Sequence, residues 1–276
     1  MVTISYMGAN LVAQQVDWSM TEGWDQGEQA ASAYYAPIET FRERFGAFIA
    51  LVVDSGFDTL DVWNAQLEWQ WATAEHLSIA RELLDASGLR VASYAGFFGD
   101  TVDEFERAAD VAEGLGTTIL SGGTGLLENG RAEMLEILRR RGLVLAIENH
   151  MEKSTSQIFD MIGDDTDVVG TAVDTGWWAT QGLSPVEALE QLAPVLRHVH
   201  LKDIRAAGAH ETCALGDGIA DIPGCVEVLS QIGFSGPISI EHEPETFDPF
   251  EDVVVSRQRL ESWLEEYPIP AEAAAR

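Results

Sequence analysis

Short, nearly continuous apolar runs alternate along the chain with longer segments in which apolar residues recur at helical spacing. The apolar runs lie at residues 2–8, 59–63, 90–94, 117–121, 143–149, 170–174, 197–201 and 238–241. The segments with helical spacing include residues 39–55, 71–87, 102–115, 131–141, 223–232 and about 249–266. Nearly continuous apolar runs are typical of parallel strands buried on both faces, whereas helical spacing indicates amphipathic helices packed against a sheet.

Glycines mark the boundaries between these helices and the strands that follow. They stand directly after five of the helical segments, at Gly56, Gly88, Gly116, Gly142 and Gly233. Glycine is common just beyond a helix, because it adopts the left-handed conformation without strain. The repeated order of strand, helix and glycine predicts an α/β fold, a single-domain (β/α)8 TIM barrel over residues 1–267. The Pro- and Ala-rich residues 268–276 are expected to form a loose tail.

One connection in this pattern is unusually long. Residues 9–38, approximately, separate the first strand from the first predicted helix and carry Trp18, Trp24, Tyr34 and Tyr35. Long loops in compact domains often serve as lids. Loops that follow the strands of a barrel surround its mouth. The segment is therefore expected either to cover a site at the mouth or to pack on the surface.

Four of the apolar runs end in a residue of a metal-ligating type. These residues are Glu148, Asp174, His200 and Glu241, and they are spaced 26, 26 and 41 residues apart. Such gaps suit successive strand-and-helix units, and the carboxyl ends of barrel strands converge on one rim. Three carboxylates and one imidazole around one point need a cation to offset their repulsion. Oxygen-rich ligation with one nitrogen favours Mn²⁺, Mg²⁺, Co²⁺ or Zn²⁺.

Further polar side chains accompany these strand ends. Side chains alternate along a strand, so His150 shares a face with Glu148 and is a candidate for proton exchange with substrate above the metal. His198 precedes the last histidine of its strand by two residues and is expected one layer deeper in the barrel. Lys202 either binds a substrate oxygen or pairs with a carboxylate. Asp203 either orients a ligand or forms a surface ion pair.

The charge of the chain limits its partners. It has 46 acidic and 16 basic residues, a formal net charge of −30, and its only lysines are Lys153 and Lys202. Such a surface repels nucleic acid, because binding to nucleic acid depends on neutralising phosphates. It gives no support for binding anionic lipid either. Adaptation to salt, or a very acidic proteome, accounts for the excess without any partner.

The remaining composition indicates a protein of the cytoplasm. Cys213 and Cys225 do not make a disulfide framework and are expected to be reduced. No apolar run reaches the roughly 18 residues of a membrane span. The first residues lack the basic segment of a secretory signal, so we expect a cytoplasmic location.

The strand-end motifs resemble the xylose-isomerase-like TIM-barrel superfamily, also called sugar phosphate isomerases/epimerases, which includes ketose 3-epimerases, inosose dehydratase and a DNA-repair endonuclease branch. The resemblance covers nearly the whole chain. Its most specific pieces are Ile147-Glu148-Asn149-His150, Val173-Asp174-Thr175-Gly176, His198-Val199-His200-Leu201-Lys202-Asp203 and Ser239-Ile240-Glu241. The resemblance implies that Glu148, Asp174, His200 and Glu241 bind one divalent cation, commonly Mn²⁺. It also implies that Glu148 and Glu241 act as an acid/base pair on opposite faces of the substrate.

The chain also departs from the pattern of this superfamily. Many relatives carry a histidine shortly after the aspartate ligand, where this chain has Trp177-Trp178. The tryptophans are predicted either to stack on a sugar ring or aglycone or to pack in the core or rim. Candidate substrate contacts are Trp63, Trp177, Lys202, Asp203 and His210. The DNA-repair branch fits poorly, because its metal site needs histidines on early strands and the first histidine here is His76.

These observations lead to three functional hypotheses. The first is an isomerase or epimerase of a ketose or keto-sugar that works through an enediolate stabilised by the cation. The second is a lyase with the same metal and carboxylates, either an inosose-type dehydratase or a keto-glycoside C-deglycosidase. The third is a sugar-binding barrel without catalysis. The expected partner is a small carbohydrate; a homo-oligomer is expected, and hetero-oligomeric lyase relatives leave a second kind of subunit open.

Overall fold

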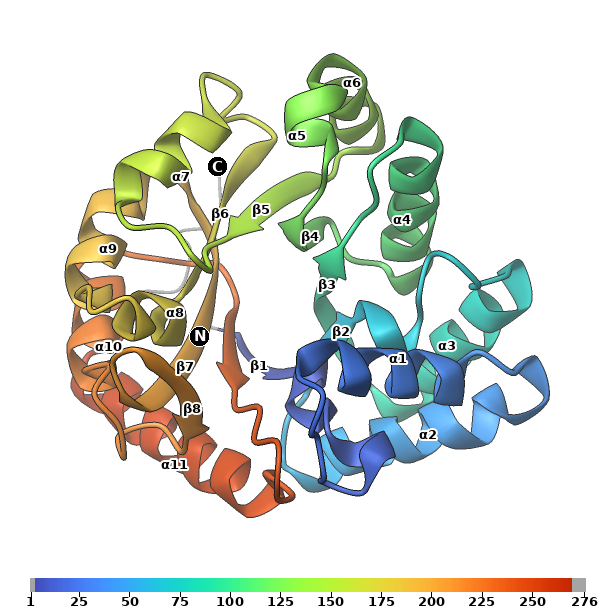
Figure 1. Ribbon diagram of the computed structural model, residues 1–276, viewed down its shortest axis with the longest axis horizontal. Helices are drawn as coiled ribbons and strands as arrows, with labels where there is room; N and C mark the ends of the chain where they lie inside the picture. Colours follow the sequence, from blue (N-terminus) through green and yellow to red (C-terminus); the bar gives the residue numbers. More distant parts are fainter. Residues whose placement is uncertain (1–2, 270–276) are drawn as a thin grey trace.

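The computed structural model describes residues 3–269 of the chain. Eight parallel strands form its barrel: β1 (Ile4–Met7), β2 (Thr59–Trp63), β3 (Arg90–Phe97), β4 (Ile119–Gly123), β5 (Val144–Glu148), β6 (Val169–Asp174), β7 (Leu196–Ala206) and β9 (Ile238–Glu241). The barrel closes because β1 pairs with both β2 and β9, while β7 pairs with both β6 and β9. Figure 1 shows the strands at the centre and the helices around them. The predicted single-domain (β/α)8 fold is confirmed.

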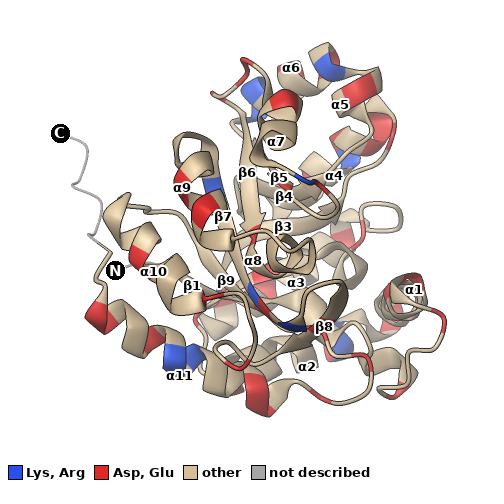
Figure 2. Ribbon diagram, turned by 60° about the vertical axis from the view of Figure 1, so that its left-hand side comes forward, with Lys and Arg blue, Asp and Glu red and all other residues tan. Residues whose placement is uncertain are grey.

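Helices cover the outside of the barrel. They are α2 (Ile38–Asp54), α3 (Ala74–Ser87), α4 (Val102–Leu115), α6 (Arg131–Arg141), α7 (Thr155–Ile162), α9 (Pro185–Leu192), α10 (Ile222–Gln231) and α11 (Phe250–Glu266). The predicted helices at 102–115 and 131–141 have the observed bounds, and the other predicted ends differ by at most three residues. Acidic residues are spread over the outer helices, among them α9 and α11 (Figure 2). Among the described residues, no helix is both long and apolar enough to cross a membrane.

Local sequence signals fix where these helices begin and end. At the start of α4, Thr101 and Glu104 form a capping box, in which each side chain accepts a hydrogen bond from the other residue's backbone N–H. At the start of α10, Asp221 accepts a hydrogen bond of 3.2 Å from Gly224 N. The five glycines predicted to follow helices all have φ between 66° and 85°. This left-handed conformation is the one for which glycine was expected.

The first connection is more ordered than the predicted loop over residues 9–38. It contains the 3₁₀ helices η1 (Gly8–Leu11) and η2 (Gln14–Val16) and the twelve-residue helix α1 (Trp24–Tyr35). Trp24, at the start of α1, lies at the barrel mouth with its ring 5.7 Å from that of Trp63. Tyr35, at the end of α1, is buried in the core. One end of the segment thus faces the mouth and the other packs in the core, whereas a role in covering the site stays a prediction.

The strand β7 is longer than predicted, which changes the structure of the mouth. It continues to Ala206 and pairs in antiparallel fashion with β8 (Ala209–Cys213), a hairpin that extends beyond the barrel. Two short helices also follow barrel strands: α8 (Thr175–Thr180) begins directly after β6, and α5 (Leu126–Asn129) begins after two residues that follow β4. The predicted start of the first strand at Val2 and most of the predicted tail, residues 270–276, lie outside the described residues.

Candidate metal centre

The four predicted ligands come together at the carboxyl ends of neighbouring strands. Glu148 ends β5, Asp174 ends β6, His200 lies in β7 and Glu241 ends β9. One ligand atom from each lies within 4.8 Å of those of the other three. The sheet register explains this convergence, because Asp174 pairs with His200 across β6 and β7.

The imidazole of His200 lies between two of the carboxylates. Its Nδ1 is 3.1 Å from Glu148 Oε1 and 3.0 Å from Glu241 Oε2. Its Nε2 is 3.0 Å from the hydroxyl oxygen of Ser121, in the middle of β4. Ser121 thus fixes the orientation of the ring, and Nδ1 is the nitrogen available to a cation.

Lys202 is the cationic neighbour of this cluster. Its ammonium lies 2.9 Å from Asp174 Oδ2, 3.1 Å from Glu241 Oε1 and 3.0 Å from Glu243 Oε2. The lysine side chain is only 2% exposed. Gly176 makes room for it, because a Cβ there would lie 2.6 Å from Lys202 Cγ. Of the two predicted roles of Lys202, pairing with a carboxylate is therefore the one that the structure shows.

The electrostatics of the cluster fit a divalent cation. Burial raises the pKa of Asp174 to about 6, although the Lys202 ammonium opposes this effect. Burial alone would raise the pKa of Glu241, but the neighbouring Lys202 and His200 outweigh burial and hold this pKa well below its usual value. Three ionised carboxylates beside one ammonium leave two negative charges, which one divalent cation balances when the imidazole is neutral.

Two oxygen atoms point the same way. Within the part of the chain that the structure describes, Asp174 Oδ2 and Glu241 Oε2 are buried and accept no well-directed hydrogen bond, although Lys202 Nζ lies 2.9 Å from the first and His200 Nδ1 lies 3.0 Å from the second. A buried carboxylate oxygen without such a partner is costly unless a cation binds it. The residues present therefore fit a divalent cation, and oxygen-rich ligation with one nitrogen suits Mn²⁺, Mg²⁺, Co²⁺ or Zn²⁺.

A buried polar layer lies beneath the ligands. His198 Nδ1 donates to the carbonyl oxygen of Pro237 at 2.9 Å, and His198 Nε2 is 2.9 Å from Asp61 Oδ1. The hydroxyl groups of Ser93 and Ser239 donate to the same carboxylate. The layer is fully satisfied and supports the ring of His200, whose centroid is 4.7 Å from that of His198. His198 thus lies deeper in the barrel, as its position in the strand predicts.

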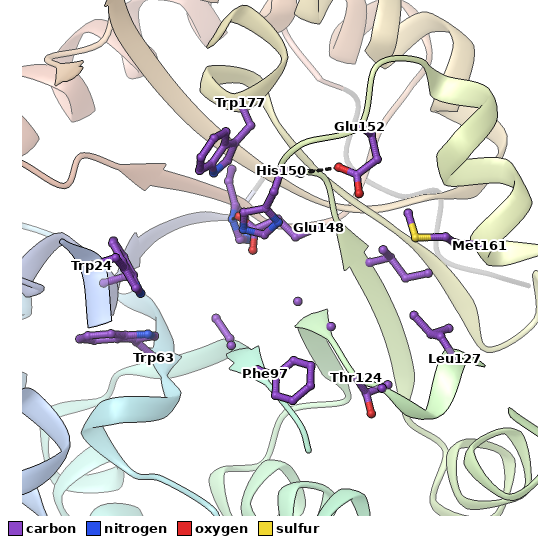
Figure 3. A pocket seen from close by; sticks show the side chains of 18 of the residues that line it. Trp24, Trp63, Phe97, Thr124, Leu127, Glu148, His150, Glu152, Met161 and Trp177 are labelled. Carbon is purple, nitrogen blue, oxygen red and sulfur yellow. Dashed lines mark hydrogen bonds and ion pairs between the residues drawn. The ribbon is translucent and has the colours of Figure 1, made fainter. Parts of the chain in front are cut away.

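A cavity of about 1170 Å³ opens above the cluster. Its wall includes Trp63, His150, Trp177, Lys202 and His210 together with three of the ligands. Figure 3 shows Trp24 and Trp63 on one side, Leu127 and Met161 on the other, and Glu148 between them. All the predicted site residues except Asp174 and Asp203 thus line one cavity.

Trp177 is held between two histidines at the rim of this cavity. His210, from the hairpin, stacks on it with 3.8 Å between ring centroids, and the ring of His150 lies 5.4 Å away. Burial and the nearby Lys202 lower the pKa of His210 to about 3, so this imidazole is neutral. One face of Trp177 is therefore already covered. Trp178 is buried in the core, so only its predicted packing role is confirmed.

Asp203 does not join the predicted substrate contacts. It is buried and does not line the cavity, and its carboxylate accepts hydrogen bonds from the backbone N–H groups of Ile204, Gly216, Gly218 and Ala220. Its carboxylate therefore orders the loop after β8. The prediction of a substrate contact or a surface ion pair for Asp203 was wrong, because the sequence does not show how the chain returns to this strand.

Sequence reasoning also missed residues at the site. Glu243 contacts the ammonium of Lys202, and Ser121 contacts the imidazole of His200. Glu243 follows Glu241 by two residues and so shares its face of the chain, which was the available signal. Ser121 ends a predicted strand, but serine is too common at such places to stand out. Phe97, at the end of β3, was missed because the predicted strand stopped at residue 94.

Comparison with known proteins assigns the family. Residues 49–267 match the model of the xylose isomerase-like TIM barrel, so the chain belongs to that family. It is 28% identical over 159 residues to the inosose dehydratase of Clostridium botulinum (strain Alaska E43 / Type E3), covering 49% of this chain and 53% of that protein. It is 24% identical over 241 residues to the inosose dehydratase of Serratia proteamaculans (strain 568), covering 66% and 80%. For several such relatives the chain spans about half of their length.

Solved structures share the fold. An L-ribulose 3-epimerase has a TM-score of 0.69 at 16% identity, covering 97% of this chain and 96% of that chain. A probable 3-DHS dehydratase from Bacillus anthracis has a TM-score of 0.66 at 13% identity, covering 95% and 99%. At these identities the likeness concerns the fold alone, which is common to epimerases and dehydratases.

Proposed function

We propose that the protein is a divalent-metal-dependent isomerase or epimerase of a ketose or keto-sugar. The observation that carries the proposal is the position of Glu148 and Glu241 on either side of His200, in a four-residue cluster at the base of a large cavity. Two carboxylates that flank one point can serve a substrate from two directions. Removal of a proton on one side and its return on the other is the chemistry of epimerisation.

The protein's own residues account for the proton transfers. A bound cation supplies Lewis acidity, which stabilises negative charge on a carbonyl oxygen. One of Glu148 and Glu241 accepts the proton from the carbon next to the carbonyl. The other delivers a proton, which it first takes up from solvent or from a substrate hydroxyl, to the neighbouring carbon or to the opposite face. Lys202 holds Glu241 in place through an ion pair of 3.1 Å. His150, at the exposed rim, is placed to exchange a proton with a substrate hydroxyl.

A lyase is the second candidate, and the likeness to inosose dehydratases favours it. Elimination begins with the same removal of a proton next to a carbonyl. It then differs only in the loss of a hydroxyl or other group from the next carbon, which leaves protonated. The same carboxylate pair can carry out both reactions, so the product decides between them.

The test is the reaction in D₂O with Mn²⁺-loaded protein and a panel of ketoses, inososes and keto-glycosides, followed by mass spectrometry. An isomeric product supports an isomerase or epimerase, with a gain in mass where the base exchanges its proton with solvent. Loss of water or release of an aglycone assigns the protein to the lyases.

Two variants test the acid/base pair. Glu148→Gln and Glu241→Gln should each lower turnover by about 10²- to 10⁴-fold, the usual contribution of a general acid or base. Glu245→Gln is the matched control, because Glu245 also lines the cavity but is exposed and outside the ligand cluster. Wild-type turnover in both Gln variants of the pair would contradict the proposed roles.

A further inference from the structure

The cavity is larger than a single sugar needs. Its volume of about 1170 Å³ exceeds the roughly 300–1,000 Å³ of pockets that bury drug-sized ligands. The ligand cluster lies at one part of its base, and the wall continues over the ends of β3 and β4 to α5 and α7. We call this extension the side lobe and define it by Phe97, Gly123, Leu127 and Met161. It is continuous with the candidate metal centre.

Missing side chains create the side lobe. The strands β3 and β4 approach closely where Gly96 lies beside Gly122, since a Cβ on Gly122 would lie 1.9 Å from the carbonyl oxygen of Gly96. Gly123 is different. Its φ is not positive, and a Cβ there would meet only Phe97 Cδ2, at 3.9 Å. The fold does not require glycine at position 123, and the space that a side chain would occupy belongs to the cavity.

Three apolar side chains line the side lobe among polar neighbours. Phe97 is 48% exposed, which is unusual for a phenylalanine at the end of a barrel strand. Leu127 in α5 and Met161 in α7 lie across the lobe (Figure 3). Apolar side chains around a concave surface next to a polar centre favour a ligand with a polar end and an apolar end.

The charges of the side chains in the cavity wall disfavour an anionic ligand. The basic residues in its wall are Lys202 and Arg131. Lys202 contacts three carboxylates, and Arg131 donates to the carbonyl oxygens of Met161 and Ile162 and to Asp165. Neither cation is free for a phosphate. The remaining ionisable side chains of the lobe's surroundings, such as Asp100, Glu128 and Asp160, are acidic and repel one.

We propose that the side lobe binds an apolar substituent of the sugar, so that the substrate is an uncharged keto-sugar joined to a flat apolar group and not a sugar phosphate. The polar ring lies over the ligand cluster, and the apolar group lies against Phe97, Leu127 and Met161. The inference rests on the proposed function for the identity of the sugar end. The size of the lobe, its apolar side chains and its charge support the proposed apolar end of the substrate, whichever reaction takes place at the sugar end.

Binding separates this inference from catalysis. Ordinary glycosides lack the carbonyl and cannot react in the proposed way, so they report binding alone. Calorimetric titration of the Mn²⁺-loaded protein compares methyl and 4-nitrophenyl β-D-glucopyranoside, the matching galactosides, and methyl β-D-glucopyranoside 6-phosphate. We expect the aryl glycoside to bind about 10- to 100-fold more tightly than the methyl glycoside in at least one series, from burial of the aromatic group. The phosphate should bind more weakly than its parent.

One substitution should remove this preference. Gly123→Val fills the side lobe and should abolish most of the aryl advantage, while the affinity for the methyl glycoside changes by less than about threefold. Gly46→Val is the matched control, because Gly46 lies in α2 away from the cavity and its added Cβ meets only Leu83, at 3.8 Å. This variant should retain the aryl preference.

Each outcome bears on one of the two proposals. Three results would overturn the side-lobe inference, even if a free ketose is epimerised. They are equal affinities for the aryl and methyl glycosides in both series, an equal loss of affinity for the two glycosides in Gly123→Val, and tighter binding of the phosphate than of its parent. An aryl preference that Gly123→Val removes supports the lobe, even if no member of the keto-sugar panel reacts. Absence of any reaction with the panel would count against the proposed function alone.

Discussion

Replacing Lys202 by methionine is expected to destabilise the metal-free protein severely. Methionine has a similar length and no charge, so the variant keeps the volume and removes the ammonium. The structure then leaves Asp174, Glu241 and Glu243 buried without the cation that lies within 3.1 Å of each. Breaking a buried ion pair by removing one partner costs about 3–5 kcal/mol. With three carboxylates affected, we expect the free energy of unfolding to fall by at least the lower end of that range.

The chain offers a matched control, because its only other lysine is Lys153. That side chain is exposed and contacts the amide oxygen of Gln181, so Lys153→Met should change stability little. Urea unfolding of both variants in EDTA, followed by circular dichroism, measures the difference. Adding Glu241→Gln to Lys202→Met should restore part of the loss, because Lys202 holds the pKa of Glu241 well below its usual value and the second change removes that buried charge.

The reasoning would be refuted if Lys202→Met and Lys153→Met unfold at the same urea concentration. That result would mean that the carboxylates are stabilised by protons or water and not by the lysine. A loss that Mn²⁺ fully restores would instead show that cation and lysine neutralise the same charges. A loss that Mn²⁺ only partly restores is the expected result, because Glu243 contacts Lys202 but lies outside the ligand cluster.

Three further predictions concern metal, loop and surface. Asp174→Asn should lower Mn²⁺ affinity by at least tenfold, as measured by equilibrium dialysis, whereas Asp217→Asn should not; equal affinities would remove Asp174 from the ligand set. Asp203→Asn should destabilise the protein by about 1–3 kcal/mol in urea unfolding, because backbone N–H groups lose their acceptor; an unchanged midpoint would contradict the role of Asp203 in the loop. Raising KCl to about 1 M should raise the thermal midpoint by screening the net charge of −30; a falling midpoint would show that repulsion does not limit stability.

The barrel and the ligand cluster were predictable because both follow from local patterns. A nearly continuous apolar run identifies a buried strand, and a polar residue at its carboxyl end must lie on the rim of a parallel barrel. Glu148, Asp174, His200 and Glu241 are therefore placed by their strands alone. The predicted bounds of β2 and β9 are those observed.

The helix α1 was not predictable in the same way. Its buried residues Gly27, Ala31 and Tyr35 recur every fourth position, but two of them are too small to give a hydrophobic period. Gly27 packs against the backbone, since a Cβ there would lie 2.4 Å from the carbonyl oxygen of Val12. The contact is long-range and leaves no trace in the local pattern.

The partners of polar side chains were the least predictable feature. Lys202 and Asp203 are adjacent in sequence and lie on opposite faces of β7, as strand alternation requires. One face meets the carboxylates of β6 and β9, while the other meets the loop after β8. Which face meets which group depends on strand order and on the hairpin, and both are properties of the whole fold.

The acidity of the chain should affect the binding of a metal ion but not that of an uncharged sugar. A net charge of −30 attracts cations to the mouth and repels phosphates, and both effects weaken as salt screens the field. Binding of an uncharged glycoside has no such long-range contribution. The association rate of Mn²⁺ should therefore fall steeply with ionic strength, while glycoside affinity at saturating Mn²⁺ stays nearly constant. If glycoside affinity fell with ionic strength in parallel with the association rate of Mn²⁺, glycoside binding would depend on the electric field of the protein. That result would contradict the proposal of an uncharged substrate.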